Sequence, residues 1–184
     1  NINNGINEII YGNPSKEKYK VLVLGDSGIG SKTSFLNVLV KNQFDYNNYG
    51  TYEGALSSKK INLNNGKELT IDFWDTPGQE KYRSLIKLFL KDIDCAILGY
   101  EVIRKESFEN IKTFWMELLK ESSDVDLIYL VGNKIDLFEK RVVEENEARK
   151  YCEEKNIRYF EISCKDSIGI QELLDDLTNQ LTKI

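Results

Sequence analysis

A glycine-containing segment near the start of the chain, "GDSGIGSKTS" (residues 25–34), has the composition of a phosphate-binding loop. It follows an apolar run and precedes a helical pattern, so its backbone N–H groups and the helix N-terminus can together bind an anion. The usual loop places Gly-Lys-Ser/Thr after four free positions, whereas here Ser31 separates Gly30 from Lys32. Besides a plain strand-to-helix turn, the residues leave two alternatives. The lysine is lost from its place, or one inserted residue has displaced it.

A second polar segment, "DFWDTPGQE" (residues 72–80), ends the second strand of a predicted hairpin. The carboxylate of Asp75 could hold Mg²⁺ there, directly or through water, beside the β- and γ-phosphates of a nucleotide. On its own, the run from Asp75 to Gly78 could equally be an ordinary turn. Downstream of a phosphate loop, it favours metal-assisted phosphate chemistry.

Two further segments follow later strands and predict recognition of a base. In "GNKIDL" (residues 132–137) a carboxylate can accept hydrogen bonds from the ring N–H and the exocyclic amine of guanine. Adenine lacks that donor pair and would leave a buried charge unpaired. In "EISCKD" (residues 161–166), backbone N–H groups of Ser163, Cys164 and Lys165 could reach the guanine O6. The alternative for "GNKIDL" is a helix-capping Asn/Asp loop, and the alternative for "EISCKD" is an ordinary strand-to-helix turn.

Composition excludes several other classes of protein. The chain of 184 residues has 30 acidic and 25 basic residues and a net charge of -5, which argues against a nucleic-acid-binding protein. The absence of histidine excludes the usual hydrolase triads and most zinc enzymes. The three cysteines are far apart, which predicts buried, reduced thiols in a reducing compartment. No apolar run reaches the roughly 18 residues that a membrane span needs.

The elements that must position these segments alternate between strands and helices. This order predicts an α/β domain with a mostly parallel six-stranded sheet, helices on both faces and one antiparallel hairpin at the edge. The first 18 residues, rich in Asn, predict a flexible arm. Expected strands cover residues 19–25, 93–100, 125–134 and 157–163, with the hairpin over 56–75; expected helices cover 32–44, 81–92, 105–121, 143–156 and 169–182.

In this order and at these distances, the four polar segments resemble those of the Ras-like small GTPases, over residues 19 to 181. "WDTPGQEKYRSL", "RKESFENIKTFW", "LVGNKIDL" and Trp74 between the two expected switch segments are most similar to the Rab branch. The resemblance implies a single-domain phosphate-loop GTPase fold over residues 19–184. It also implies a switch that binds GTP or GDP with Mg²⁺, hydrolyses GTP slowly and regulates vesicle traffic.

The resemblance further implies a role for individual residues. Lys32 lies twelve positions before Phe44, which is the family spacing, so Ser31 is interpreted as the inserted residue and Lys32 and Thr33 keep their roles. Gln79 would orient the attacking water. Mg²⁺ would be held by Thr33, Thr51 and Asp75. The residues expected to bind the nucleotide are Ser27, Gly28, Ile29, Gly30, Ser31, Lys32, Thr33, Ser34, Phe44, Thr51, Gly78, Asn133, Lys134, Asp136, Ser163, Cys164 and Lys165.

Some positions depart from the family pattern. Pro77 stands where alanine is usual, and Thr51 comes one position early in the first switch. These departures and the altered phosphate loop support an alternative hypothesis, a Rab-like interaction module that binds nucleotide without hydrolysing it. An enzyme that uses ATP is disfavoured by "GNKID".

The resemblance also implies partners and a location. An exchange factor, an activating protein that supplies an arginine, and effectors are expected to bind the two switches and Trp74 between them. The chain ends "LTNQLTKI", without the cysteines that Rab proteins use for prenylation. Membrane attachment is therefore expected only through a lipidated terminus outside this chain, with the protein in the cytoplasm or on the cytoplasmic face of intracellular membranes.

Overall fold

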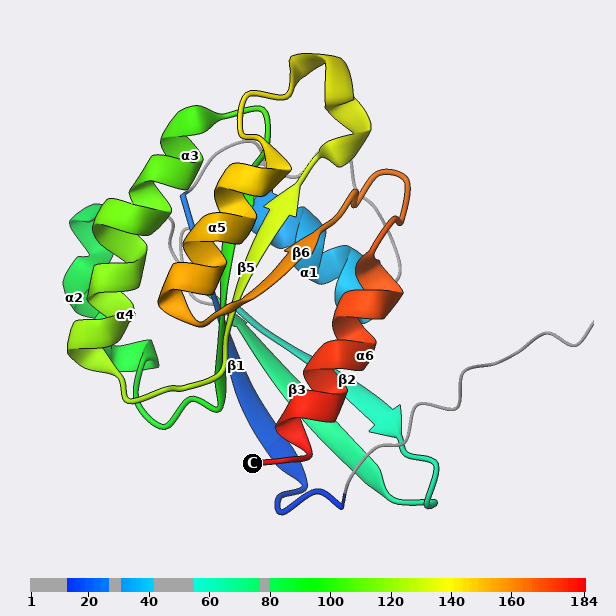
Figure 1. Ribbon diagram of the computed structural model, residues 1–184. Coiled ribbons are helices and arrows are strands. Elements are labelled where there is room, and N and C mark those ends of the chain that lie inside the picture. The colour runs from blue at the N-terminus through cyan, green and yellow to red at the C-terminus, as the bar shows by residue number, and fades with distance from the viewer. Residues whose placement is uncertain (1–12, 27–30, 42–54, 77–79) are drawn as a thin grey trace, which may run out of the picture.

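The computed structural model describes residues 13–26, 31–41, 55–76 and 80–184, and these form a six-stranded sheet with helices on both faces (Figure 1). The sheet order is β2-β3-β1-β4-β5-β6, in which the β2–β3 pair is antiparallel and the other pairs are parallel. The predicted fold class is thereby confirmed. The strands are β1 (Lys18–Leu24), β2 (Ala55–Asn62), β3 (Glu68–Asp75), β4 (Cys95–Glu101), β5 (Ile128–Asn133) and β6 (Arg158–Glu161).

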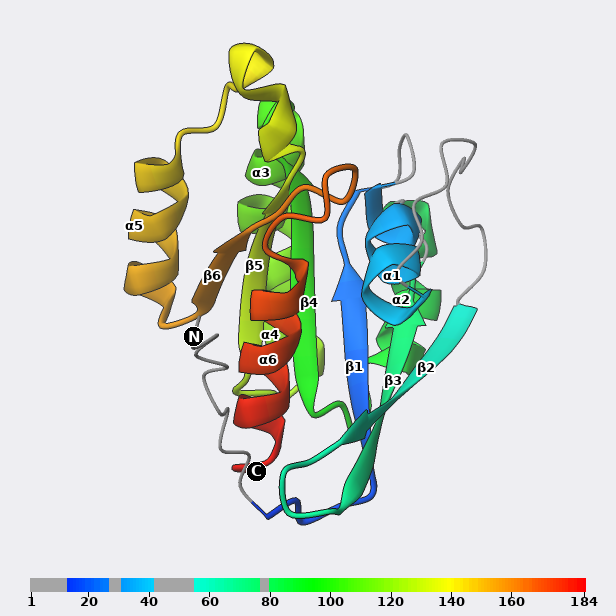
Figure 2. The ribbon, with the colours of Figure 1, turned by 90° about the vertical axis from the view of Figure 1, so that its right-hand side faces the viewer.

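The central strands are apolar on both faces because each face is covered by helices. Along β1, Val21 and Val23 point to one face while Leu22 and Leu24 point to the other, and all four are buried. On the first face lie α1 (Ser31–Lys41) and α6 (Ile170–Leu181). On the second lie α2 (Arg83–Phe89), α5 (Glu145–Lys155) and a helical run over residues 105–122 (Figure 2). The sheet therefore separates two hydrophobic layers.

The hairpin forms as the sequence predicts. Its turn contains Asn64 and Asn65, and Gly66 adopts a φ of 82°, which a residue with a side chain rarely adopts. The backbone N–H of Leu63 donates to the carbonyl of Lys67 at 2.8 Å and closes the turn. Charged side chains on β2, among them Lys60 paired with Glu68, occupy this edge of the sheet and hinder pairing with another chain.

Several helices differ from the sequence-based expectation. The predicted helix over 81–92 is instead a 3₁₀ turn, η1 (Glu80–Tyr82), followed by α2, which ends before Asp92 adopts a left-handed φ of 55°. The predicted helix over 105–121 is three pieces: α3 (Lys105–Asn110), the π-helical turn η2 (Ile111–Trp115) and α4 (Met116–Ser122). A 3₁₀ helix, η3 (Ile135–Lys140), follows β5 and was not expected.

The described residues before β1 pack against the end of the sheet opposite the predicted site. The hydroxyl of Ser15 donates to the carbonyl of Ile184 at 2.7 Å, and Lys16 pairs with Asp94. The two ends of the described chain therefore lie close together (Figure 2). Among the described residues, none of the helices is long and apolar enough to cross a membrane. All three cysteines are buried, free thiols.

The end of β1 approaches β4 so closely that only glycine fits. Gly25 has a φ of 150°, and a Cβ placed on it would lie 2.4 Å from the backbone oxygen of Gly99. Because the obstacle is backbone in the centre of the sheet, it cannot rotate away as a side chain could. Gly25 therefore lets the end of β1 pack closely against the backbone of β4.

We predict that Gly25→Ala lowers the free energy of unfolding by about 3 kcal/mol, through overpacking and backbone strain together. Gly66→Ala is the matched control, because its φ is also positive but nothing lies within 4 Å of the added Cβ. It should cost only about 1 kcal/mol. Urea unfolding of both variants measures the difference, and equal costs would show that the contact with Gly99 is unimportant.

Candidate nucleotide-binding site

The described parts of the predicted site segments lie at one edge of the sheet. They follow β1, β3, β5 and β6, and because these strands are parallel, their carboxyl ends meet at the same edge, at the top of Figure 2. Ligands of open α/β sheets bind at this edge. The predicted residues Ser27, Gly28, Ile29, Gly30, Phe44, Thr51, Gly78 and Gln79 lie outside the described residues, as does Pro77.

Lys32 lies in the first turn of α1 and joins the ends of β1 and β3. Its ammonium donates to the carbonyl oxygen of Thr76 at 2.5 Å and lies 3.9 Å from the Asp75 carboxylate. The hydroxyl of Thr76 in turn donates to the carbonyl of Val23 on β1 at 2.8 Å. The structure thus brings together the lysine and the acidic residue that the sequence separates by more than forty positions.

The Lys32 ammonium is unusually buried for a cation. Only 7% of the residue is exposed, and Asp75 is 1% exposed. Burial lowers the pKa of Lys32 to about 8, although the charges of Asp75 and then Asp26 oppose that shift. A phosphate brought to this ammonium would add the negative charge that stabilises its protonated form. Ser34 is also buried; Ser31 and Thr33 belong to α1, but their side chains lie outside the described part of the structure.

The segments after β5 and β6 are hydrogen-bonded to each other. The side-chain oxygen of Asn133 accepts from the backbone N–H of Lys134 at 2.8 Å and from that of Cys164 at 3.3 Å. The Ser163 hydroxyl donates to the Asp136 carboxylate at 2.8 Å. These bonds place the Asp136 carboxylate and the Ser163–Cys164 backbone, the two halves of the predicted base site, beside one another.

Lys134 adopts a left-handed φ of 71°, and its ammonium lies 3.1 Å from the buried carboxylate of Glu101 at the end of β4. Sequence reasoning did not assign Glu101 to the site. The signal that could have identified it is its position, because Glu101 is a charged residue at the end of an otherwise apolar strand. Cys164 is buried, and burial raises the pKa of its thiol to about 12, so it is neutral at physiological pH. Lys165 is exposed.

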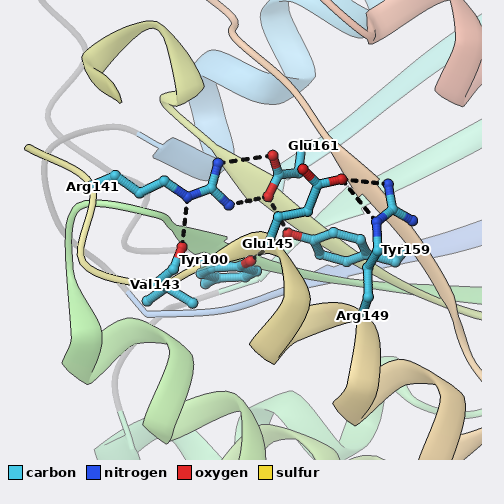
Figure 3. Close-up of polar contacts among 7 residues, drawn as sticks. All are labelled: Tyr100, Arg141, Val143, Glu145, Arg149, Tyr159 and Glu161. Carbon is cyan, nitrogen blue, oxygen red and sulfur yellow. Dashed lines mark hydrogen bonds and ion pairs between the residues drawn. The ribbon is translucent and has the colours of Figure 1, made fainter. Parts of the chain in front are cut away.

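A second group of polar side chains fixes the end of β6, two residues before Ser163 (Figure 3). Arg141 donates to both carboxylate oxygens of Glu161 and, through Nε, to the carbonyl of Val143 at 2.7 Å. Tyr159 donates to the same carboxylate, and its hydroxyl lies 2.8 Å from that of Tyr100 on β4. Bidentate arginine–carboxylate pairs are strongly oriented. Glu161 is therefore held in place at the point where β6 ends and the predicted base-binding segment over residues 161–166 begins.

This geometry defines a class of protein: an α/β phosphate-loop nucleotide-binding protein of the small GTPase type. Comparison with known proteins then identifies the family. A model of the Ras family matches residues 20–183.

Curated relatives agree with this match. Ras-related protein Rab-7a of Dictyostelium discoideum is 36% identical over 170 residues, which cover 90% of this chain and 83% of the relative. Ras-related protein Rab-2B of the same organism is 33% identical, over 90% and 81%. GTP-binding protein ypt5 of Schizosaccharomyces pombe is 34% identical, over 88% and 77%. The chain belongs to the Ras family, and within it is a Rab-like GTPase, a switch of membrane traffic.

The contacts in Figure 3 predict an acid-dependent stability. Burial raises the pKa of Glu161, but the hydrogen bonds from Arg141 and Tyr159 outweigh it, and the net pKa lies below the usual 4.5. Glu161→Gln should cost about 2 kcal/mol of unfolding free energy at pH 7. Because a depressed carboxyl pKa stabilises only above the unfolded value, the difference between variant and parent should shrink as the pH falls below 4.5.

The matched control is Glu145→Gln, which breaks the pair with Arg149 in the same view. About half of each of those side chains is exposed, so the loss should stay within about 0.5 kcal/mol. Urea unfolding at several pH values compares the two variants. A loss of unfolding free energy in Glu161→Gln that does not change with pH would contradict a lowered pKa of Glu161.

Proposed function

We propose that this protein is a Rab-type switch that binds GTP and GDP with Mg²⁺ and hydrolyses GTP slowly. The observation that carries the proposal is the buried Lys32 ammonium, which lies at the same sheet edge as the linked Asn133 and Asp136 segments. The Lys32 end of that edge suits a phosphate, and the Asn133–Asp136 end suits a base. The membership of the chain in the Ras family supports the same proposal.

On the phosphate side, Lys32 would bind the β- and γ-phosphates. Among the described residues, its ammonium donates one hydrogen bond, to the Thr76 carbonyl, so its remaining N–H groups can donate to phosphate oxygens. The segment from Ser27 to Ser34 would supply backbone N–H groups around the same phosphates. Burial strengthens these electrostatic contacts because little water competes with them.

On the base side, the carboxylate of Asp136 would accept both guanine donors, while the Ser163–Lys165 backbone faces the O6 atom. The bond from Ser163 orients the carboxylate before a base arrives. The side chain of Lys134, fixed by Glu101, would lie along the base. Phe44 would pack at the rim of the site.

The donor set fits Mg²⁺, which prefers oxygen ligands and retains several waters. Asp75 provides a buried carboxylate at the end of β3, and Thr33 and Thr51 would complete the set. When bound, the ion would neutralise charge that develops on the transferred phosphoryl group. Gln79 would orient the attacking water, and Gly78 would donate its N–H to the γ-phosphate.

Partner proteins would distinguish the GTP-bound from the GDP-bound form by contacts with the β2–β3 hairpin and with α2. Trp74 pairs with Leu56 across the hairpin and packs against Phe89, 5.8 Å between ring centroids. Leu56 is 51% exposed and Leu88 on α2 is 65% exposed. We propose that effectors, an exchange factor and an activating protein bind this surface together with the adjoining switches. The protein would act at the cytoplasmic face of intracellular membranes.

Measuring phosphate release over many turnovers tests the proposal as a whole. The protein should bind GDP in Mg²⁺, release phosphate slowly from GTP, and leave ATP unhydrolysed. Tight GDP binding without phosphate release over many turnovers would favour the alternative, an interaction module that does not hydrolyse. Failure to bind guanine nucleotides would refute both.

We predict that Asp136→Asn lowers the affinity for GDP at least roughly 100-fold, because one acceptor of the pair becomes a donor. The same variant should gain affinity for xanthosine diphosphate, which presents an oxygen where guanine has its amine. Asp166→Asn is the matched control, since that exposed side chain lies close by without a role in the base site. Competition titrations measure all three proteins; an unchanged affinity for GDP would place the base elsewhere.

The inserted residue of the phosphate loop can be tested separately. Lys32→Ala should reduce the affinity for GDP about 10- to 150-fold, because a charge-assisted contact is lost. Ser31→Ala should have little effect, and deletion of Ser31 should preserve the affinity, because the family spacing is restored. Titration with labelled GDP in Mg²⁺ gives these values. Full affinity in Lys32→Ala would show that the lysine does not bind phosphate.

A further inference from the structure

The π-helical turn η2 changes which side chains share a face of the helical run over 105–122. In an α-helix, residues five positions apart point about 140° away from each other. A π turn closes its hydrogen bonds between residues five apart, so such residues lie above one another. Asn110 and Trp115, at the two ends of this turn, therefore face the same way.

Both side chains donate to one carboxylate, that of Asp26. The amide of Asn110 donates to Asp26 Oδ2 at 2.7 Å, and the indole N–H of Trp115 donates to Oδ1 at 2.8 Å. Trp115 is fully buried, so its indole N–H needs a partner within the protein. Asp26 directly follows Gly25, where the chain leaves β1. The π turn thus anchors the beginning of the phosphate-loop segment.

The same contacts extend to Lys32, at the other end of that segment. The Lys32 ammonium lies 6.0 Å from the centroid of the Trp115 ring, within range of a cation–π attraction. Asp26 therefore acts on the lysine through the orientation of the indole that it holds.

The π turn has poorer hydrogen-bond geometry than the α-helix it interrupts, and such turns occur frequently at functional sites. A regular helix over the same residues would direct either Asn110 or Trp115 away from Asp26. One of the two hydrogen bonds to Asp26 would then be lost. Loss of the Trp115 bond would leave a buried indole N–H without this acceptor, and loss of the Asn110 bond would leave Asp26 Oδ2 without this donor. The two charge-assisted bonds offset the cost of the irregular turn.

We propose that Asp26 is a positioning residue for the phosphate-binding Lys32, and that the π turn aligns the two side chains that hold it. This inference rests on the proposed function, because it takes the phosphates of a nucleotide as the ligand of Lys32. It predicts that the contacts of Asp26 matter for the phosphates of the nucleotide and little for its base.

The test measures dissociation of fluorescently labelled GDP from the Mg²⁺-loaded protein. Asp26→Asn should accelerate dissociation about 10- to 100-fold, and Trp115→Phe, which retains an aromatic ring without the N–H, about 10-fold. The affinity for GMP, which lacks the phosphates that Lys32 would bind, should change less than about 3-fold in either variant. Equal losses for GDP and GMP would overturn the proposal and leave Asp26 a purely structural residue.

A matched control separates this effect from general destabilisation. Asp176 on α6 also accepts from one aromatic side chain and one other donor, Tyr129 at 2.5 Å and Arg158 at 2.7 Å, away from the site edge. Asp176→Asn should lower the melting temperature about as much as Asp26→Asn and leave GDP dissociation unchanged. If it accelerates dissociation equally, the Asp26 effect reflects stability alone.

The double variant tests whether the two residues act through one bond. In the Asp26→Asn background, Trp115→Phe should add no more than about a 2- to 3-fold change, because the bond is already weakened. Fully multiplicative effects would contradict the shared contact. If the parent protein binds no GDP, the proposed function fails and this inference fails with it. If the parent binds GDP and the variants match it, only the inference is refuted.

Discussion

The buried ammonium of Lys32 is the interaction on which the arrangement of the site depends. A cation with so little exposure must meet acceptors and negative charge inside the protein, or its burial is strongly unfavourable. Those groups come from the end of β3, which must therefore lie beside β1, with Val23 opposite Asp75 in the register. The helix that carries the lysine must begin directly after the chain leaves β1. The order of the strands and the position of α1 both satisfy this one requirement.

Much of the fold could be predicted from local patterns. Short apolar runs between polar segments located the strands, and the Asn-Asn-Gly turn located the hairpin. The π turn could not be found in this way, because residues 105–121 have a continuous helical pattern and the extra residue per turn is set by contacts with Asp26, more than eighty positions away. The early end of α2 was likewise missed, since a left-handed Asp92 leaves little trace in apolar spacing.

Of the candidate site, the sequence indicates the segments that contain both a turn and candidate side chains, as in "GNKIDL", and the roles of these side chains stay predictions. The residues that support these side chains were missed because they come from other elements. Glu101 reaches Lys134 from β4, and Arg141 reaches Glu161 across twenty positions. The π turn likewise supports the site from another element, and it makes contacts on two sides. Trp115 contacts Asp26 at the start of the phosphate-loop segment. Phe114 packs edge-on against the Trp115 ring and lies under Arg83, the first residue of α2.

The hydrogen bond between Asn133 and Cys164 determines when, during synthesis of the chain, the two parts of the site can come together. Lys32, Asp75 and Thr76 of the proposed phosphate half lie in the first half of the chain, and the π turn that holds Asp26 follows at residues 111–115. The proposed base half needs the segment after β6, the last strand. At ribosomal rates, the roughly 90 residues between Thr76 and Ser163 take on the order of 5–20 s to synthesise. During that interval the nascent chain holds the proposed phosphate half without the proposed base half. Under the proposed function, guanine nucleotide would stabilise this fold only after synthesis of the domain is nearly complete.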